Sequence, residues 1–207
     1  MDNFNYFALK YLNDWHLWDK PFSERISSEL NSDSREALHE AAKYYKVTRN
    51  FSILDSEKDE RLQAALNLLL KIDEPVMEDN VCSIVTTLAD DFKIKYSKNA
   101  VSAASKFLWL RFKSPVVIFD SRAIAWLRNN GYEVPHSGGY KEYREQWIAA
   151  FNDNENKISS ACSKLENVKE YSLAFEYSKK DIKELSKSRW FKERVFDKYL
   201  WFNSNND

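Results

Sequence analysis

The chain has 207 residues, of which 43% are hydrophobic and 15% aromatic, enough apolar material for a sizeable core. Its net charge of −1 excludes a global field that would draw the whole chain onto nucleic acid or a membrane. With three glycines and four prolines, tight turns are few, and we expect helices joined by short polar loops. The sequence predicts an all-α fold, a compact multi-helix bundle with little or no sheet.

Charge is distributed unevenly along the chain. Residues 1–80 carry 10 basic and 16 acidic side chains, whereas residues 81–207 carry 21 and 16. We expect a single helical domain over residues 1–207, and the alternative is an acidic lobe of residues 1–92 beside a second lobe of residues 93–207. The segment 92–113 holds basic side chains and no acid. This segment is either a solvated surface or a basic face.

The two cysteines, Cys82 and Cys162, lie in helix-like patterns without a disulfide framework, which favours reduced thiols in a cytoplasmic protein. No apolar run approaches the roughly 20 residues of a membrane helix. The first ten residues lack a basic region followed by an apolar core, so we expect no signal peptide and no membrane partner.

Apolar residues recur at helical spacing along most of the chain. Expected helices cover residues 2–18, 32–47, 55–73, 76–92, 97–112, 121–129, 140–152, 155–177 and 179–201. Ser and Asp caps are expected where the helices at 32 and 55 begin, and Ser178 with Asp181 has the spacing of a capping box. Gly131 is placed to end a helix, and residues 131–140 form a flexible loop. Residues 115–119, "PVVIF", are the candidate extended segment.

The expected helix at 97–112 carries a lysine among apolar side chains. On a wheel of 100° per residue, apolar residues spread nearly all round it, which is typical of a helix in the centre of a bundle. Lys106 shares its side with Ser102, Trp109 and Lys113, so it either extends along Trp109 to the surface or lies in an apolar pocket. In a pocket, desolvation lowers the pKa of a lysine, as an amine nucleophile requires.

Fourteen residues later, Asp120 precedes the apolar run "SRAIAWL". The position is that of an N-cap, whose side-chain oxygen accepts from free amides of the first helical turn. Capping alone explains an aspartate here. A capping carboxylate is also held rigidly, which suits a catalytic role.

"VSAASKFLWL" followed by "PVVIFDSRAIAWL" resembles the core of helix-hairpin-helix DNA glycosylases. More narrowly, "ASKFLWL", "PVVIFDSRA" and the closing "RVFDKYLWF" resemble short bacterial proteins with an 8-oxoguanine DNA glycosylase-like fold. The resemblance covers residues 97–130 well and residues 189–202 moderately. It implies a helix-hairpin-helix glycosylase fold in which Lys106 matches the nucleophilic lysine and Asp120 the catalytic aspartate.

The resemblance also implies base excision from DNA, with a lysine Schiff base and lyase activity of the kind used in DNA repair. Lys106 would attack the sugar C1′ of a flipped nucleotide, and Asp120 would stabilise the developing positive charge. The expected base-pocket residues are Trp109 and Trp126, although for each of them packing in the core is the more ordinary role. Expected contacts to the DNA backbone are Lys93, Lys95, Lys98, Lys113 and Arg122.

Glycines normally precede the lysine of this hairpin, and this sequence has "SKNAVSAAS" instead. This departure favours the alternative, a catalytically inactive nucleic-acid-binding or interaction protein such as a phage-defence component, with a protein partner that the sequence does not identify. A second basic face is possible around Lys183, Lys187 and Arg189, where docking on the core is the default. The scattered histidines and the lack of a cysteine cluster or phosphate loop predict no metal and no cofactor.

Overall fold

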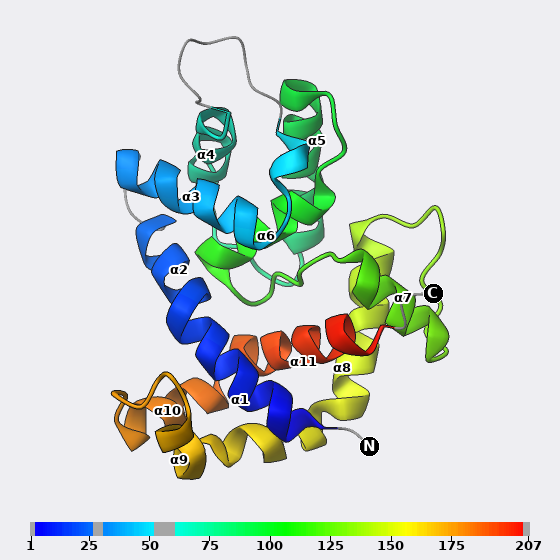
Figure 1. Ribbon diagram of the computed structural model, residues 1–207. Coiled ribbons are helices and arrows are strands. Elements are labelled where there is room, and N and C mark those ends of the chain that lie inside the picture. The colour runs from blue at the N-terminus through cyan, green and yellow to red at the C-terminus, as the bar shows by residue number, and fades with distance from the viewer. Residues whose placement is uncertain (1–2, 27–30, 52–60, 205–207) are drawn as a thin grey trace. The chain divides into compact units, whose positions relative to one another are not determined.

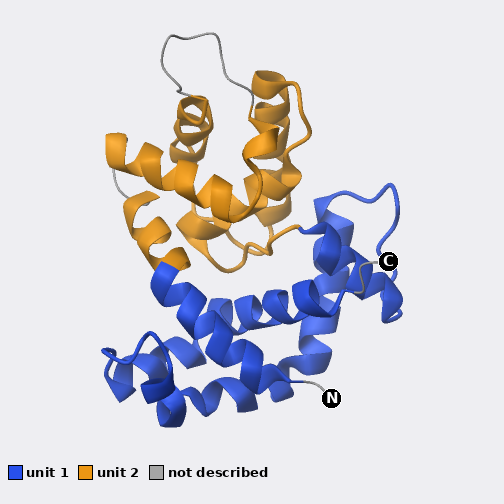
Figure 2. Ribbon diagram, viewed as in Figure 1, with its two compact units in different colours: residues 1–17, 120–207 blue, residues 18–119 orange. Residues whose placement is uncertain are grey.

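The regular structure of the chain is helical (Figure 1). The computed structural model describes residues 3–26, 31–51 and 61–204, and none of the residues in these ranges forms a β-strand. The prediction of an all-α fold is therefore confirmed. The chain divides into two compact units, residues 1–17 with 120–207 and residues 18–119, which Figure 2 colours separately. Whether the chain is one domain, or two lobes meeting at residue 92, stays a prediction.

A π-helical turn, Trp15–Asp19, contains the boundary between the two units, and the unit of residues 18–119 begins within this turn. In this unit α2 packs on α3 and α6, α4 on α3 and α5, and α5 on α6. Phe51 lies at the centre of its core, with its ring centroid 5.5 Å from that of Phe92 and 5.7 Å from that of Phe107. Its elements are α2 (Lys20–Ile26), α3 (Ser32–Tyr44), a 3-10 turn (Thr48–Asn50), α4 (Gln63–Leu70), α5 (Val81–Tyr96) and α6 (Val101–Phe112).

In the other unit α1 packs on α8 and α11, and α11 also packs on α7 and α8. Trp147 stacks on Phe151 one turn later, with centroids 5.5 Å apart, and Phe196 of α11 meets the Trp147 ring edge-on at 5.2 Å. These aromatic pairs form the centre of the core. The elements are α1 (Phe4–Asp14), α7 (Ser121–Asn129), α8 (Tyr140–Ser163), α9 (Leu165–Val168), a 3-10 turn (Lys169–Tyr171), α10 (Lys179–Lys187) and α11 (Arg189–Asn203).

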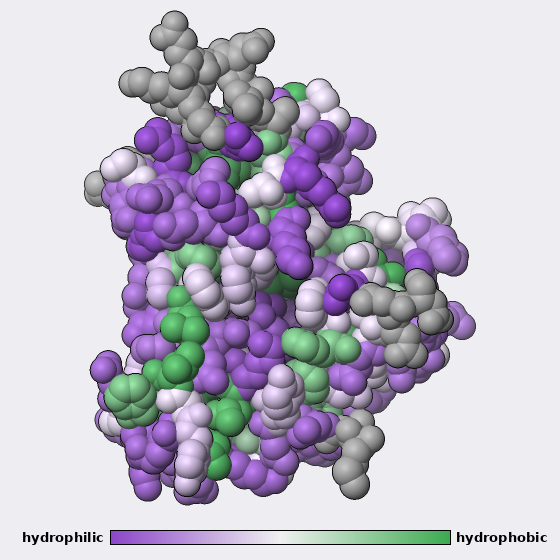
Figure 3. Space-filling view, in the orientation of Figure 1, coloured by the Kyte–Doolittle hydropathy of each residue, from purple (hydrophilic) through white to green (hydrophobic). Residues whose placement is uncertain are grey.

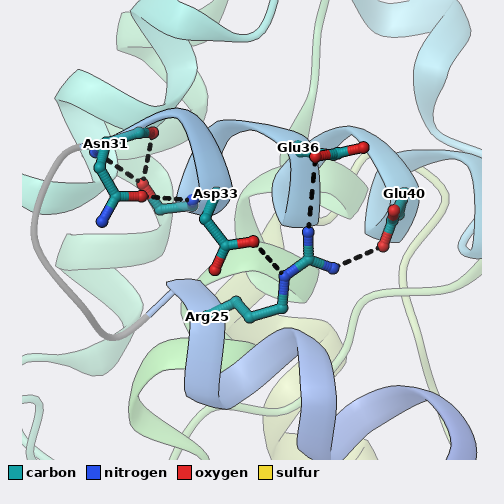
Figure 4. Close-up of polar contacts among 6 residues, drawn as sticks. Arg25, Asn31, Asp33, Glu36 and Glu40 are labelled. Carbon is teal, nitrogen blue, oxygen red and sulfur yellow. Dashed lines mark hydrogen bonds and ion pairs between the residues drawn. The ribbon is translucent and has the colours of Figure 1, made fainter.

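One arginine fastens α2 to α3 (Figure 4). Arg25 on α2 donates from Nε to Asp33 at 2.8 Å and from Nη1 to Glu40 at 2.7 Å, and its Nη2 lies 4.0 Å from Glu36. The three acids lie along one side of α3 because their spacings of three and four residues match the helical repeat. Ion pairs between Arg25 and these acids thus join α2 to α3 in addition to the packing of the two helices.

Several helix boundaries differ from the sequence predictions. The first helix does not end near residue 18, because the π turn leads directly into α2, and Pro21 is tolerated in its first turn. The prediction of two helices at residues 140–152 and 155–177 is wrong, because one helix, α8, runs without a break from Tyr140 to Ser163. At the polar stretch between them, the Asn154 side chain donates to the carbonyl of Ala150 and does not break the helix.

The last expected helix, residues 179–201, is two helices. Ser188 has an extended backbone, φ −65° and ψ 137°, and serves as the C-cap of α10 and the N-cap of α11. Its hydroxyl donates to the carbonyl of Leu185, which gives the end of α10 a polar partner. The helix expected at 76–92 is shifted and is observed as Val81–Tyr96.

Some of the predicted helix caps are confirmed and others differ. The Ser178–Asp181 capping box is confirmed, and Gly131 follows α7 with a φ of +88°, as a C-terminal glycine should. The cap of α3 is Asn31 paired with Ser34, not a Ser or Asp at residues 32–33. The cap expected near residue 55 lies outside the described residues. Residues 115–119 form no strand.

Candidate functional site

The helix α6 is buried on nearly every side, as its all-round apolar pattern predicts. Every residue from Ala103 to Leu110 is buried, including Lys106, which is only 5% exposed. The Lys106 side chain therefore does not extend to solvent. Its Nζ donates to Oγ of Ser102, one turn earlier on the same helix, at 2.7 Å. A buried lysine is uncommon, because burying a charge is costly.

A second serine connects this helix to the link that follows it. Ser105 Oγ accepts from the backbone N–H of Phe119 at 2.9 Å and donates to the carbonyl of Ser102 at 3.2 Å. The end of the link is thus held beside α6, next to Lys106 in sequence. Sequence reasoning did not single out Ser105, and its bond spans 14 residues, so no local pattern indicates it.

Asp120 is the N-cap of α7, and this part of the prediction is confirmed. Its Oδ1 accepts from the backbone N–H of Arg122 at 3.0 Å, and its own backbone is extended. The backbone of Asp120 is also hydrogen-bonded to the hydroxyl of Tyr143, a buried residue of α8. The cap therefore rests on the core of its unit.

Lys106 and Asp120 belong to different units, residues 18–119 and residues 1–17 with 120–207. Lys106 donates to Ser102 within α6, and Asp120 accepts from Arg122 and is bonded through its backbone to Tyr143. A shared site for the pair stays a prediction.

The unit that contains the Asp120 cap also contains a mostly buried carboxylate. Asp197 of α11 accepts from Trp147 Nε1 and from Arg194 Nη1, each at 3.0 Å, and its side chain is 10% exposed. Burial raises the pKa of Asp197 from 3.8 to about 6, against the opposing effect of Arg194 and Trp147. The charge of Asp197 also contributes, after burial, to raising the pKa of Tyr143. Arg194 and Asp197 belong to the closing segment "RVFDKYLWF" that carries part of the sequence resemblance, whereas no sequence pattern indicates Trp147, the second donor to Asp197.

The predicted backbone-binding residues lie in both units, four of them in residues 18–119 and Arg122 in the other unit. Lys93, Lys95 and Lys98 are exposed at the end of α5 and in the loop before α6, and Lys98 Nζ donates to the carbonyl of Arg49 at 2.8 Å. Lys113, which ends α6, is half-buried, and burial lowers its pKa. The guanidinium of Arg122 lies 4.0 Å from the centroid of the Trp201 ring, a cation–π contact in the other unit.

The loop of residues 97–100 contains a left-handed backbone conformation, which glycine usually adopts. Ser97 ends α5 in the left-handed conformation, φ 57° and ψ 25°, and the side chain of Asn99 accepts from the N–H of Val101 at the start of α6. The α5–α6 hairpin thus makes its turn without the glycines of the glycosylases.

The two tryptophans proposed for a base pocket are core residues in the structure. Trp109 is 1% exposed and Trp126 is 7% exposed. The Trp126 ring contacts Tyr199 at 5.6 Å and stacks near Tyr132 at 6.2 Å, within its own unit. Their stacking on a base stays a prediction, and their packing is what the structure describes.

Two properties of the described residues concern metals and membranes. Within residues 3–26, 31–51 and 61–204, no cluster of three or more His, Cys, Asp or Glu is placed to hold a metal ion. Over the same ranges, none of the helices combines the length and hydrophobicity that crossing a bilayer requires.

Comparison of the chain with family models, with curated proteins and with solved structures finds no match.

Proposed function

We propose that the chain is a cytoplasmic, DNA glycosylase-like protein that excises a base and cleaves the strand through a Schiff base on Lys106. The observation that carries the proposal is the burial of Lys106 on an apolar helix with its Nζ bonded to Ser102. Holding the amine in one orientation suits a nucleophile, because positioning lowers the barrier to attack. The reaction itself is inferred from the sequence resemblance. The exposed cations Lys93, Lys95 and Lys98, at the end of α5 and in the loop before α6, are the proposed contacts to phosphate.

In the proposed reaction, uncharged Nζ of Lys106 attacks C1′ of a flipped nucleotide and the C1′–N bond to the base breaks. The base leaves with the electrons of that bond and takes up a proton. The nitrogen gives up one proton, and the C1′–O4′ bond breaks with its electrons passing to O4′, which takes up a proton, so that a protonated imine remains. Removal of a C2′ proton then breaks the C3′–O bond and expels the 3′ phosphate with the electrons of that bond. The Asp120 carboxylate stabilises the positive charge that develops on the sugar.

Borohydride trapping tests this chemistry directly. Wild-type protein incubated with a duplex containing one abasic site should form a covalent adduct when the imine is reduced. Lys106→Ala should form none, whereas Lys71→Ala, at an exposed lysine of the same unit, should trap like wild type. Adducts of equal yield in Lys106→Ala and wild type would contradict the proposal.

Asp120→Asn separates charge from capping. Asparagine caps helices as well as aspartate does, so the melting temperature should stay close to that of wild type. The rate of adduct formation should fall about a hundredfold, the ordinary scale of a lost catalytic carboxylate. An unchanged rate would leave Asp120 with capping alone.

The second candidate is a binding protein that retains the helical architecture without the chemistry, for example a phage-defence component with a protein partner. The glycine-free loop of residues 97–100 favours it, since a bare backbone approach to phosphate is lost. It predicts binding to duplex DNA without an adduct. Under both candidates, replacing Lys93, Lys95 and Lys98 together by alanine should reduce the slope of log affinity against log salt by about 3.

A further inference from the structure

Charge is segregated along α3 and the segment that follows it. The acids Asp33, Glu36 and Glu40 lie toward its N-terminal part and face Arg25 on α2, as Figure 4 shows. Residues 41–54 contain no acid and three cations, Lys43, Lys46 and Arg49, which we call the basic end of α3.

The basic end of α3 is exposed, and within the described residues none of its three side chains forms an ion pair. Lys46 turns the chain with a φ of 57°, and the carbonyl of Arg49 accepts from Lys98. This hydrogen bond brings a fourth exposed cation, from the loop before α6, to the same end of the unit. Four cations therefore gather where two helical segments end.

An aromatic pair with one exposed ring, Trp18, and one half-buried ring, Tyr44, lies at the end of α3. Hydrophobic side chains interrupt a largely hydrophilic surface (Figure 3). The aromatic ring of Trp18 is also accessible, at 42% exposure. Its ring stacks on that of Tyr44, the last residue of α3, with centroids 5.4 Å apart and planes 24° apart. Lys43 precedes Tyr44 directly in the chain.

The aromatic pair is supported from beneath. Tyr44 contacts the buried ring of Phe22 at 6.0 Å and meets Tyr45 edge-on at 5.1 Å. The hydroxyl of Tyr45 donates to the buried carboxylate of Asp19 at 2.7 Å. Trp18 therefore presents its ring on a fixed base, which limits the entropy lost when a ligand stacks on it.

We propose that Trp18 and Tyr44, with the basic end of α3, bind a single-stranded stretch of nucleic acid. An unpaired base stacks on the exposed indole, and the cations contact the neighbouring phosphates. Exposed rings beside a groove of cations are the common means of binding single strands, since every base has a π-face. A duplex hides those faces in its own stack. The inference is independent of the chemistry of Lys106 and remains testable if no adduct forms.

Fluorescence anisotropy of a labelled oligo-dT of about 12 nucleotides provides the test. Trp18→Leu should bind about tenfold more weakly, because stacking contributes roughly 1–3 kcal/mol per base, whereas Trp18→Phe should stay within about threefold of wild type. The slope of log affinity against log salt should not change in either variant, since no cation is removed. Replacing Lys43, Lys46 and Arg49 by alanine should instead lower that slope by about 2.

Matched controls keep the result specific. Phe175→Leu and the triple alanine variant of Lys180, Lys183 and Lys187 remove an exposed ring and three exposed lysines from the other unit, and both should bind like wild type. An oligomer of abasic sugars with the same number of phosphates should bind at least tenfold more weakly than oligo-dT.

Two results would overturn the proposal. One is equal affinity of folded Trp18→Leu and Trp18→Phe, with folding verified by circular dichroism. The other is a loss of binding in the α10 triple variant but not in the variant of the basic end of α3, which would place the strand on the other unit.

Discussion

The buried carboxylate of Asp197 should make the stability of the protein depend on pH in an unusual direction. Burial raises its pKa in the folded chain from 3.8 to about 6, although Arg194 and Trp147 both bond to it. The folded state therefore binds a proton more tightly than the unfolded state does. Stability from this group is fully present below pH 3.8 and is lost as pH rises through about 6.

The magnitude follows from the two pKa values. Moving a pKa from 3.8 to about 6 corresponds to about 3 kcal/mol, and about 2 kcal/mol of this falls between roughly pH 4.5 and pH 7.5. The assay is urea unfolding of wild type and Asp197→Asn at several pH values across that range. The free energy of unfolding of wild type, minus that of the variant, should decrease by about 2 kcal/mol as pH rises.

Taking this difference cancels the titration of the other acids, which both proteins share. Glu176→Gln, at an exposed carboxylate of the same unit, controls for the removal of one negative charge. A difference that stays flat, or rises with pH, would refute the reasoning. It would mean that the bonds from Arg194 and Trp147 outweigh burial and keep Asp197 ionised throughout the range.

Three further predictions concern stability and reactivity. Arg25→Ala should lower the free energy of unfolding by about 1 kcal/mol in urea titrations, because it unpairs three acids, while Lys20→Ala, in an exposed i,i+4 pair, should have almost no effect. Ser97→Gly should raise the melting temperature by relieving a left-handed residue worth about 1 kcal/mol, and Ser97→Ala should not. A thiol reagent should label Cys82 in the folded protein but Cys162 only on unfolding, since Cys162 is buried and burial raises its pKa to about 12.

Features that depend on neighbours in sequence could be predicted from the sequence. The Asp120 cap, the Ser178–Asp181 box and the terminal Gly131 all depend on residues within four positions, and each is confirmed. The all-round burial of α6 follows from its composition in the same way. The wheel also placed Ser102 on the same side as Lys106, which is the spacing of their hydrogen bond.

Features that depend on distant partners could not be predicted. The bond from Trp147 to Asp197 joins residues 50 positions apart, and that from Ser105 to Phe119 joins a hydroxyl to a backbone amide without a sequence signature. The break at Ser188 was missed for a related reason. Its immediate neighbours Lys187 and Arg189 both favour helix, and the extended backbone between α10 and α11 contains no glycine or proline.

Asp120 has two suggested roles, capping of α7 and catalysis, and one does not exclude the other. A capping oxygen is bonded to a backbone amide, and this bond fixes the direction of the carboxylate without removing its charge. Tyr143 fixes the backbone of the same residue from the core of its unit. A residue held in this way is better prepared to stabilise a cation than a free surface aspartate, because it need not reorganise when charge appears. Capping therefore leaves the proposed catalytic role intact, and only the loss of charge at constant stability, as in Asp120→Asn, separates the two.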